Sequence, residues 1–151
     1  MKSFPMLLLG VALTAPVSTW AQTSAPAGSV VVIANRAVPV EKIDPSQATQ
    51  IFLKQVQTWP DGKPIQPIDI KEGAPLRMEF YSKITGRSPG QLRSYWARQA
   101  FTGMGFPPRE VATAADVNKV VQTTPGAIGY LDRKNADAGV KVLLDSSNPT
   151  P

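Results

Sequence analysis

The sequence contains neither cysteine nor histidine. The absence of cysteine excludes disulfides, thiol chemistry and the attachment of lipid to a cysteine. The absence of histidine removes the usual proton shuttle near neutral pH and the commonest metal ligand. Ser–His–Asp sets, Cys–His pairs and metal clusters built on these residues are therefore excluded. We expect no catalytic residue, no metal site and no cofactor, and hence a protein that is not an enzyme.

The acidic residues do not form a recognisable acid–base pair. Asp61 and Glu72 are single carboxylates in separate predicted loops. No two acidic residues have a spacing that would place both on one helical face beside a pocket-forming loop, as general acid–base catalysis requires. The sequence pattern therefore disfavours a hydrolase.

Residues 1–21 have the pattern of a secretory signal peptide. Lys2 supplies the positive start, Met6–Leu13 is an apolar run too short to span a bilayer, and a small-x-small cleavage site ends at Ala21. The alternative, an N-terminal membrane anchor, is disfavoured by the short run and by Pro16 beside it. We predict cleavage after Ala21 and an exported, periplasmic protein without membrane insertion.

The rest of the chain is long enough for one domain with a hydrophobic core. Residues 22–28 are rich in Ser, Ala and Pro and predict a flexible leader. The domain is expected over residues 29–144, followed by a frayed tail at 145–151. The formal net charge is +5, which falls by one when Lys2 is removed with the signal peptide. This moderate positive charge favours an anionic ligand or surface, but only weakly.

Periodicity and capping residues predict the element order β-α-β-α-α-α-β-β, which indicates an α/β fold with a mixed sheet and packed helices. Strands are expected at residues 29–34, 65–70, 127–131 and 140–144, and helices are expected to start at Asp44–Pro45, Ala74–Pro75, Ser88–Pro89 and Thr113. Prolines around the second strand predict an edge position. The expected apolar faces of the first three helices comprise Ala48, Ile51, Phe52 and Val56, then Leu76, Phe80 and Ile84, then Leu92, Tyr95, Trp96 and Ala100.

The joint between the last helix and the strand after it is the most distinctive stretch. Pro125 cannot continue the helix, and Gly126 tolerates the positive φ that a helix exit often needs. Residues 127–131 are short and apolar enough for a buried strand. Gly129 within that strand predicts a close approach of another segment to the backbone.

Two blocks resemble the phosphate-type periplasmic solute-binding proteins of ABC transporters. Residues 125–130, Pro-Gly-Ala-Ile-Gly-Tyr, match one family run. Residues 51–54 with 58–65, Ile-Phe-Leu-Lys and Thr-Trp-Pro-Asp-Gly-Lys-Pro-Ile, resemble the family segment "IFLGK…W.DG..I". The resemblance spans residues 29–144 and implies one lobe, the second, of the two-lobed type II periplasmic-binding fold. Within that PBP-like family, this sequence is similar to the short, single-lobe members.

The same resemblance draws attention to residues 69–77, where a predicted strand runs into a helix N-terminus. Family members carry an arginine and then an Asp-Gly-Ser-Gly-Thr loop, whose hydroxyls and amides hold the oxyanion. Here Glu72-Gly73 matches, but residues 74–76 (Ala-Pro-Leu) replace the Ser, Gly and Thr, and Asp69 replaces the arginine. Two hydroxyl donors, one N–H and one guanidinium are therefore lost, and the carboxylate of Asp69 is expected to repel an anion where the arginine would attract it.

The candidate ligand-binding residues of this loop are Lys71, Gly73, Ala74 and Arg77, because free N–H groups and a helix dipole attract anions. Either basic side chain could replace the lost donors, or it could simply be solvated on the helix surface.

The resemblance implies capture of inorganic phosphate or another small anion for a membrane transporter. The degraded loop favours the alternative, a periplasmic protein-interaction module that serves a sensor or membrane complex and no longer binds phosphate. Arg93, Tyr95, Trp96 and Arg98 raise the possibility of base stacking, but the helical spacing of the two aromatic residues with Leu92 indicates core packing. No nucleic-acid partner is expected.

Overall fold

The computed structural model describes residues 28–148. The predicted signal peptide, residues 22–27 of the predicted leader and residues 149–151 lie outside the described residues.

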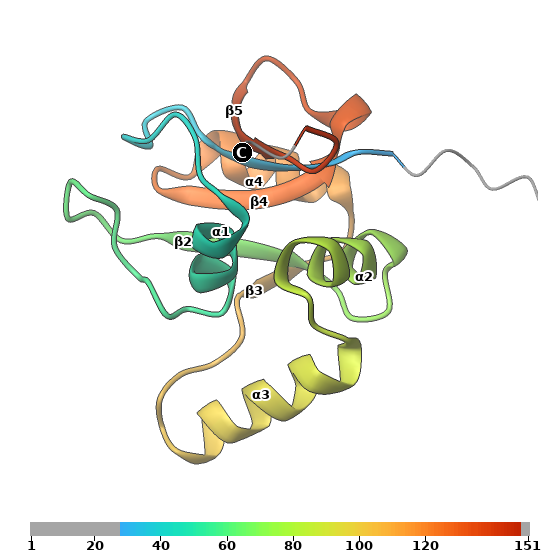
Figure 1. Cartoon of the computed structure of the whole chain (residues 1–151). Helices are drawn as coiled ribbons and strands as arrows, with labels where there is room; N and C mark the ends of the chain where they lie inside the picture. The colour runs from blue at the N-terminus through green and yellow to red at the C-terminus, as the bar shows by residue number, and fades with distance from the viewer. Residues whose placement is uncertain (1–27, 149–151) are drawn as a thin grey trace, which may run out of the picture.

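The described chain forms a five-stranded mixed sheet with helices packed on it (Figure 1). The strands are β1 (Val30–Asn35), β2 (Gln66–Ile70), β3 (Arg109–Val111), β4 (Ala127–Asp132) and β5 (Val140–Asp145). The α-helices are α1 (Pro45–Phe52), α2 (Pro75–Phe80), α3 (Pro89–Phe101) and α4 (Ala114–Thr123); a π-helical turn η1 (Tyr81–Thr85) extends α2, and a 3₁₀ turn η2 (Arg133–Asn135) follows β4. The predicted α/β class with a mixed sheet is confirmed.

The strand order is β3-β2-β4-β1-β5. β1 pairs antiparallel with both β4 and β5, whereas β2 pairs parallel with both β3 and β4. All six residues of β1 are buried, as expected for a strand covered on both faces.

Capping residues begin three of the helices as predicted. Asp44, Ser88 and Thr113 each accept a hydrogen bond from the backbone N–H three residues later, and each receives the reciprocal capping-box bond. Pro45 and Pro89 occupy the first helical positions, where their missing N–H is not needed.

The joint between α4 and β4 also follows the prediction. Gly126 has φ +79, and a Cβ there would lie 2.5 Å from the carbonyl oxygen of Pro64. At Gly129, a Cβ would lie 2.5 Å from Cγ1 of Val117, so α4 packs directly on the strand backbone. The indole of Trp59 donates to the carbonyl of Gly126 at 3.1 Å and fixes the turn at residues 59–62 to this joint.

Residues on the other face of β4 build an aromatic core. The ring of Tyr130 stacks on Phe80 at 4.0 Å between centroids and meets Phe52 edge-on at 5.7 Å. Phe52 and Phe80 come from α1 and α2, so the two helices pack on the sheet face opposite α4. The predicted burial of Phe80 and Trp96 is confirmed.

Several expectations about the periphery are wrong. β2 is not an edge strand: β3, a strand the sequence pattern missed, pairs with its second half. Pro67 is tolerated because the β3 ladder begins only at Ile68. Val56 lies beyond the end of α1 and is 40% exposed, so it is not part of that helix's apolar face.

The predicted apolar stripe of α3 is also shorter than expected. Only Leu92 and Trp96 are buried, Tyr95 is half-buried and Ala100 is exposed. At the other end of the domain, Asp145 belongs to β5 and the amide of Ser146 donates to the carbonyl of Val30. Asp145 and Ser146 are therefore bonded to the sheet, although the sequence pattern assigns them to a frayed tail.

Candidate functional site

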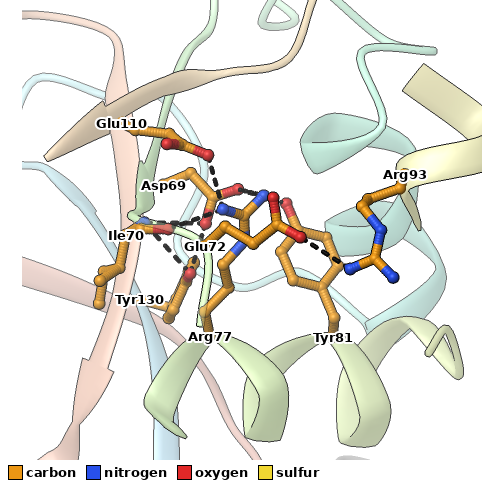
Figure 2. Close-up of polar contacts among 8 residues, drawn as sticks. All are labelled: Asp69, Ile70, Glu72, Arg77, Tyr81, Arg93, Glu110 and Tyr130. Carbon is orange, nitrogen blue, oxygen red and sulfur yellow. Dashed lines mark hydrogen bonds and ion pairs between the residues drawn. The ribbon is translucent and has the colours of Figure 1, made fainter. Parts of the chain in front are cut away.

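A buried carboxylate lies at the carboxyl end of β2. Asp69 has no exposed surface, and it is flanked along the strand by buried Ile68 and Ile70. Its carboxylate accepts hydrogen bonds from the hydroxyls of Tyr130 and Tyr81, the latter at 2.9 Å, and from the amide of Ile70 at 2.8 Å (Figure 2). Both carboxylate oxygens of Asp69 therefore accept hydrogen bonds from groups of the protein.

Arg77 of α2 supplies the matching positive charge. Its Nη2 lies 3.3 Å from Oδ2 of Asp69, and its Nη1 lies 2.6 Å from Oε1 of Glu110 on β3. Nη1 also donates to the carbonyl of Ile70 at 3.1 Å. The guanidinium therefore joins β2 to β3 from α2, the helix at the bottom of the view in Figure 2.

Burial and charge pairing compete in setting the pKa values of this network. Burial raises the pKa of Asp69, although the hydrogen bond from Tyr130 and the charge of Arg77 oppose the shift. Burial, reinforced by the nearby Asp69 carboxylate, also raises the pKa of Tyr81 and that of Tyr130 well above their usual range. Both phenols therefore remain protonated near neutral pH and act as hydrogen-bond donors.

A cavity of about 420 Å³ opens beside this network, between α2, α3 and the approach to β3. Its lining combines apolar and charged side chains: Met78, Pro89, Leu92, Trp96 and Pro107 with Glu72, Arg77, Arg93 and Glu110, among others. Arg93 and Glu72 form an exposed ion pair at 2.8 Å. The indole N–H of Trp96 is buried and has no hydrogen-bond partner among the described residues.

The four candidate loop residues lie close in sequence but play different parts. Arg77 is buried and paired, so the expectation that it could be a solvated surface residue is wrong. Lys71 is exposed, and its backbone N–H donates to Val111 of β3. Gly73 adopts φ +87 in the turn, and Ala74 is the N-cap of α2 without a side-chain capping bond.

Sequence reasoning missed the partners of Arg77. Asp69 was expected to repel an anion, but its role in binding Arg77 within the protein was not foreseen, nor were the roles of Tyr81, Glu110 and Tyr130. The available signal was an aspartate between two isoleucines of a buried strand, because a buried carboxylate requires donors or a cation.

The described residues hold no group of three or more Asp or Glu side chains placed to bind a metal ion. Within residues 28–148, no helix has the length and apolar character needed to cross a membrane.

Comparison by sequence finds no matching family model and no matching curated protein. Comparison of folds does find similar structures. A phosphate ABC transporter substrate-binding protein with bound phosphate from Clostridium perfringens has a TM-score of 0.64 at 18% identity. An ABC-type phosphate transport receptor from Vibrio cholerae has a TM-score of 0.60 at 16% identity, and PstS from Borrelia burgdorferi 0.59 at 13%.

Each of these matches covers 77% of this chain but only 44–46% of the other. The chain therefore spans less than half the length of these structures. This proportion fits a short, single-lobe relative, and identities this low establish the fold alone. The chain has the fold of one lobe of the substrate-binding proteins of phosphate ABC transporters.

Proposed function

We propose that the protein is an exported, periplasmic domain that has the fold of a phosphate-binding lobe but does not capture phosphate. It serves instead as a non-enzymatic interaction module for a sensor or a membrane complex. The observation that carries this proposal is the internal pairing of Arg77 with Asp69 and Glu110.

An oxyanion needs donors that are free to turn toward it. Arg77 is the one basic candidate beside the loop that is buried, and its guanidinium is already bound by Asp69, Glu110 and the carbonyl of Ile70. An incoming phosphate would have to displace these acceptors while lying close to two carboxylates. Like charges at such distances oppose binding in a partly buried site.

The loop backbone offers few donors in compensation. The N–H of Ala74 donates to the carbonyl of Lys71 at 3.3 Å, and Pro75 has no N–H. α2 has only six α-helical residues. Glu72 adds a further negative charge at the same turn, although Arg93 pairs with it.

The match of this domain to a single lobe bears on the same proposal. In the two-lobed family that the sequence resembles, the ligand lies between the lobes. A single lobe provides only one wall of such a cleft, so tight capture would require a second lobe or a partner. Transport of phosphate by a dimer or with a partner protein is the competing function, and the exposed Lys71 beside the loop is the feature that favours it.

Calorimetry on the chain beginning at Gln22 separates the two functions. Charge-assisted hydrogen bonds contribute roughly 1.5–3 kcal/mol each, so losing three of them removes roughly 4–9 kcal/mol. A loss of this size converts micromolar affinity to none measurable. We expect no micromolar binding of phosphate, sulfate or an organic phosphate. Micromolar binding of phosphate by the unmodified chain would overturn the proposal.

A variant with Ala74→Ser and Leu76→Thr, which restores both hydroxyls, serves as the matched comparison. We expect little gain from it, because Arg77 remains paired with Asp69. N-terminal sequencing of the exported protein tests the location: a chain beginning near Gln22 is expected, and an uncleaved product in the membrane fraction would contradict export as a free protein.

A further inference from the structure

The segment between η1 and β3 projects from the domain as an arm, defined here as residues 86–108. It consists of α3 with the stretches that join it to its neighbours, and Figure 1 shows α3 at the bottom of the view, below the sheet and the other helices. Only Leu92, Trp96 and Pro108 of the arm are buried. Most of its surface is therefore available to a partner.

The outer end of the arm exposes three large apolar side chains. Phe101 is 93% exposed, Met104 is 74% exposed and Phe106 is 69% exposed. Gly103, at φ +70, and Gly105, at φ +151, flank the methionine, so a tight turn presents all three residues within one short stretch. Clustered exposure of this kind marks a surface that contacts a protein or a membrane.

The charge around this tip has a single sign. No acidic residue occurs between Glu79 and Glu110, whereas Arg87, Arg93 and Arg98 lie on the arm and Arg109 follows it. Arg98 is exposed, forms no ion pair with any described residue, and precedes Phe101 by three helical positions. A cation and an aromatic ring thus share the outward side of the helix.

We propose that the tip formed by Phe101, Met104 and Phe106 docks on an anionic lipid surface. Basic side chains are attracted by acidic phospholipids, and the adjacent apolar side chains enter the interface between headgroups and acyl chains. This is contact with a membrane surface, not insertion of a spanning helix. The proposal is independent of whether the loop at Gly73 binds phosphate.

Charge complementarity favours a lipid surface over a second copy of the chain. Two arms facing each other would bring arginines together without a carboxylate between them. Glu72 and Glu110, the carboxylates that line the cavity beside the arm, are already paired with Arg93 and Arg77. The phosphates of a lipid surface are not paired with the arginines of this protein beforehand, so no existing ion pair of theirs has to be broken.

Sedimentation with vesicles tests the proposal. The core lies entirely within residues 30–144, so the chain beginning at Gln22 retains it and lacks the apolar run of the predicted signal peptide. We expect binding to vesicles of phosphatidylcholine and phosphatidylglycerol in equal parts, and much weaker binding to phosphatidylcholine alone. Raising the salt from about 0.1 M to about 1 M should weaken binding, because the screening length falls from about 10 Å to about 3 Å.

Substitutions assign the contact to the tip. Phe101→Ser combined with Phe106→Ser should lower the partition coefficient by roughly tenfold or more, and Arg98→Gln by about fivefold. The matched controls, Val56→Ser and Lys134→Gln, alter exposed residues outside the arm and should leave binding unchanged. Because the substituted side chains are exposed, thermal melts of all variants should match the parent.

Failure to bind the anionic vesicles, or equal effects of tip and control substitutions, would overturn the proposal. A dimer in sedimentation equilibrium that the double Phe substitution abolishes would assign the surface to a second copy and would also overturn it. A blue shift of the emission of Phe101→Trp on addition of anionic vesicles, absent with phosphatidylcholine, would support lipid contact at the tip.

Discussion

Removing the side chain of Arg77 tests the buried network directly. Arg77→Met keeps the aliphatic stem but removes the charge that pairs with Asp69, whose side chain has no exposed surface. Breaking a buried pair by removing one partner costs about 3–5 kcal/mol. The pair with Glu110, whose side chain is 42% exposed, adds no more than about 1 kcal/mol. The expected loss of unfolding free energy is therefore about 3–6 kcal/mol.

Arg93→Met provides the matched control. Arg93 also pairs with a glutamate, Glu72, but the two side chains are 63% and 57% exposed. An ion pair this exposed contributes at most about 1 kcal/mol. Urea unfolding followed by the fluorescence of the buried Trp59 and Trp96 measures both variants under the same conditions.

The pH dependence gives the experiment a second signature. Burial raises the pKa of Asp69 in the folded protein, and the charge of Arg77 opposes that shift, so Arg77→Met raises this pKa further. A group with a raised folded pKa binds its proton more tightly in the folded state, so its contribution is fully present at low pH and is lost as the pH rises through the folded pKa. The deficit of Arg77→Met should be largest near neutral pH and should shrink toward about pH 4. A deficit no larger than that of Arg93→Met, or one that grows on acidification, would refute the reasoning.

Three further predictions concern stability, each read from thermal or urea unfolding. Ala74→Ser should stabilise the protein by about 0.5–2 kcal/mol, because α2 has no side-chain N-cap. An unchanged stability would mean that other acceptors already bond the N–H groups at the start of α2. Gly129→Ala should cost about 1–3 kcal/mol because its Cβ would meet Val117, whereas Gly90→Ala, whose Cβ would meet only Nη2 of Arg93 at 4.0 Å, should be neutral or stabilising; equal effects would contradict the packing of α4 on β4. Trp96→Ala should cost about 3–5 kcal/mol, and an unchanged melt would show that this side chain is not part of the core.

The parts of the fold that could be predicted from sequence depend on local signals. A capping box places its two residues three positions apart, so Asp44, Ser88 and Thr113 mark helix starts whatever the rest of the chain does. The exit from α4 at Gly126 and the close packing at Gly129 were likewise predictable, because each follows from the properties of one residue.

The parts that could not be predicted depend on partners far away in sequence. β3 has only three residues, Arg109–Val111, with no apolar alternation, and it is a strand because β2 offers it an edge to pair with. Val56 has the right spacing for the apolar face of α1, but the helix ends at Phe52 and periodicity alone cannot show this. At the site, comparison with the family loop predicts that Asp69 repels an anion, whereas the hydroxyl of Tyr130, 61 positions later, makes its carboxylate a bonded acceptor.

The buried network also explains why the altered loop would resist simple reversal. In the resembled family an arginine near this position faces an external oxyanion, whereas here Asp69 supplies the negative charge from within the protein and neutralises Arg77. Replacing Asp69 to free that arginine would leave the hydroxyls of Tyr81 and Tyr130 without their acceptor, and unsatisfied buried donors cost about 1–3 kcal/mol each. Restoring the loop hydroxyls alone would leave the guanidinium paired. If the proposed function holds, the charge pair and the loop would have to change together before this lobe could bind phosphate, and variants of the loop alone are expected to remain inactive in binding.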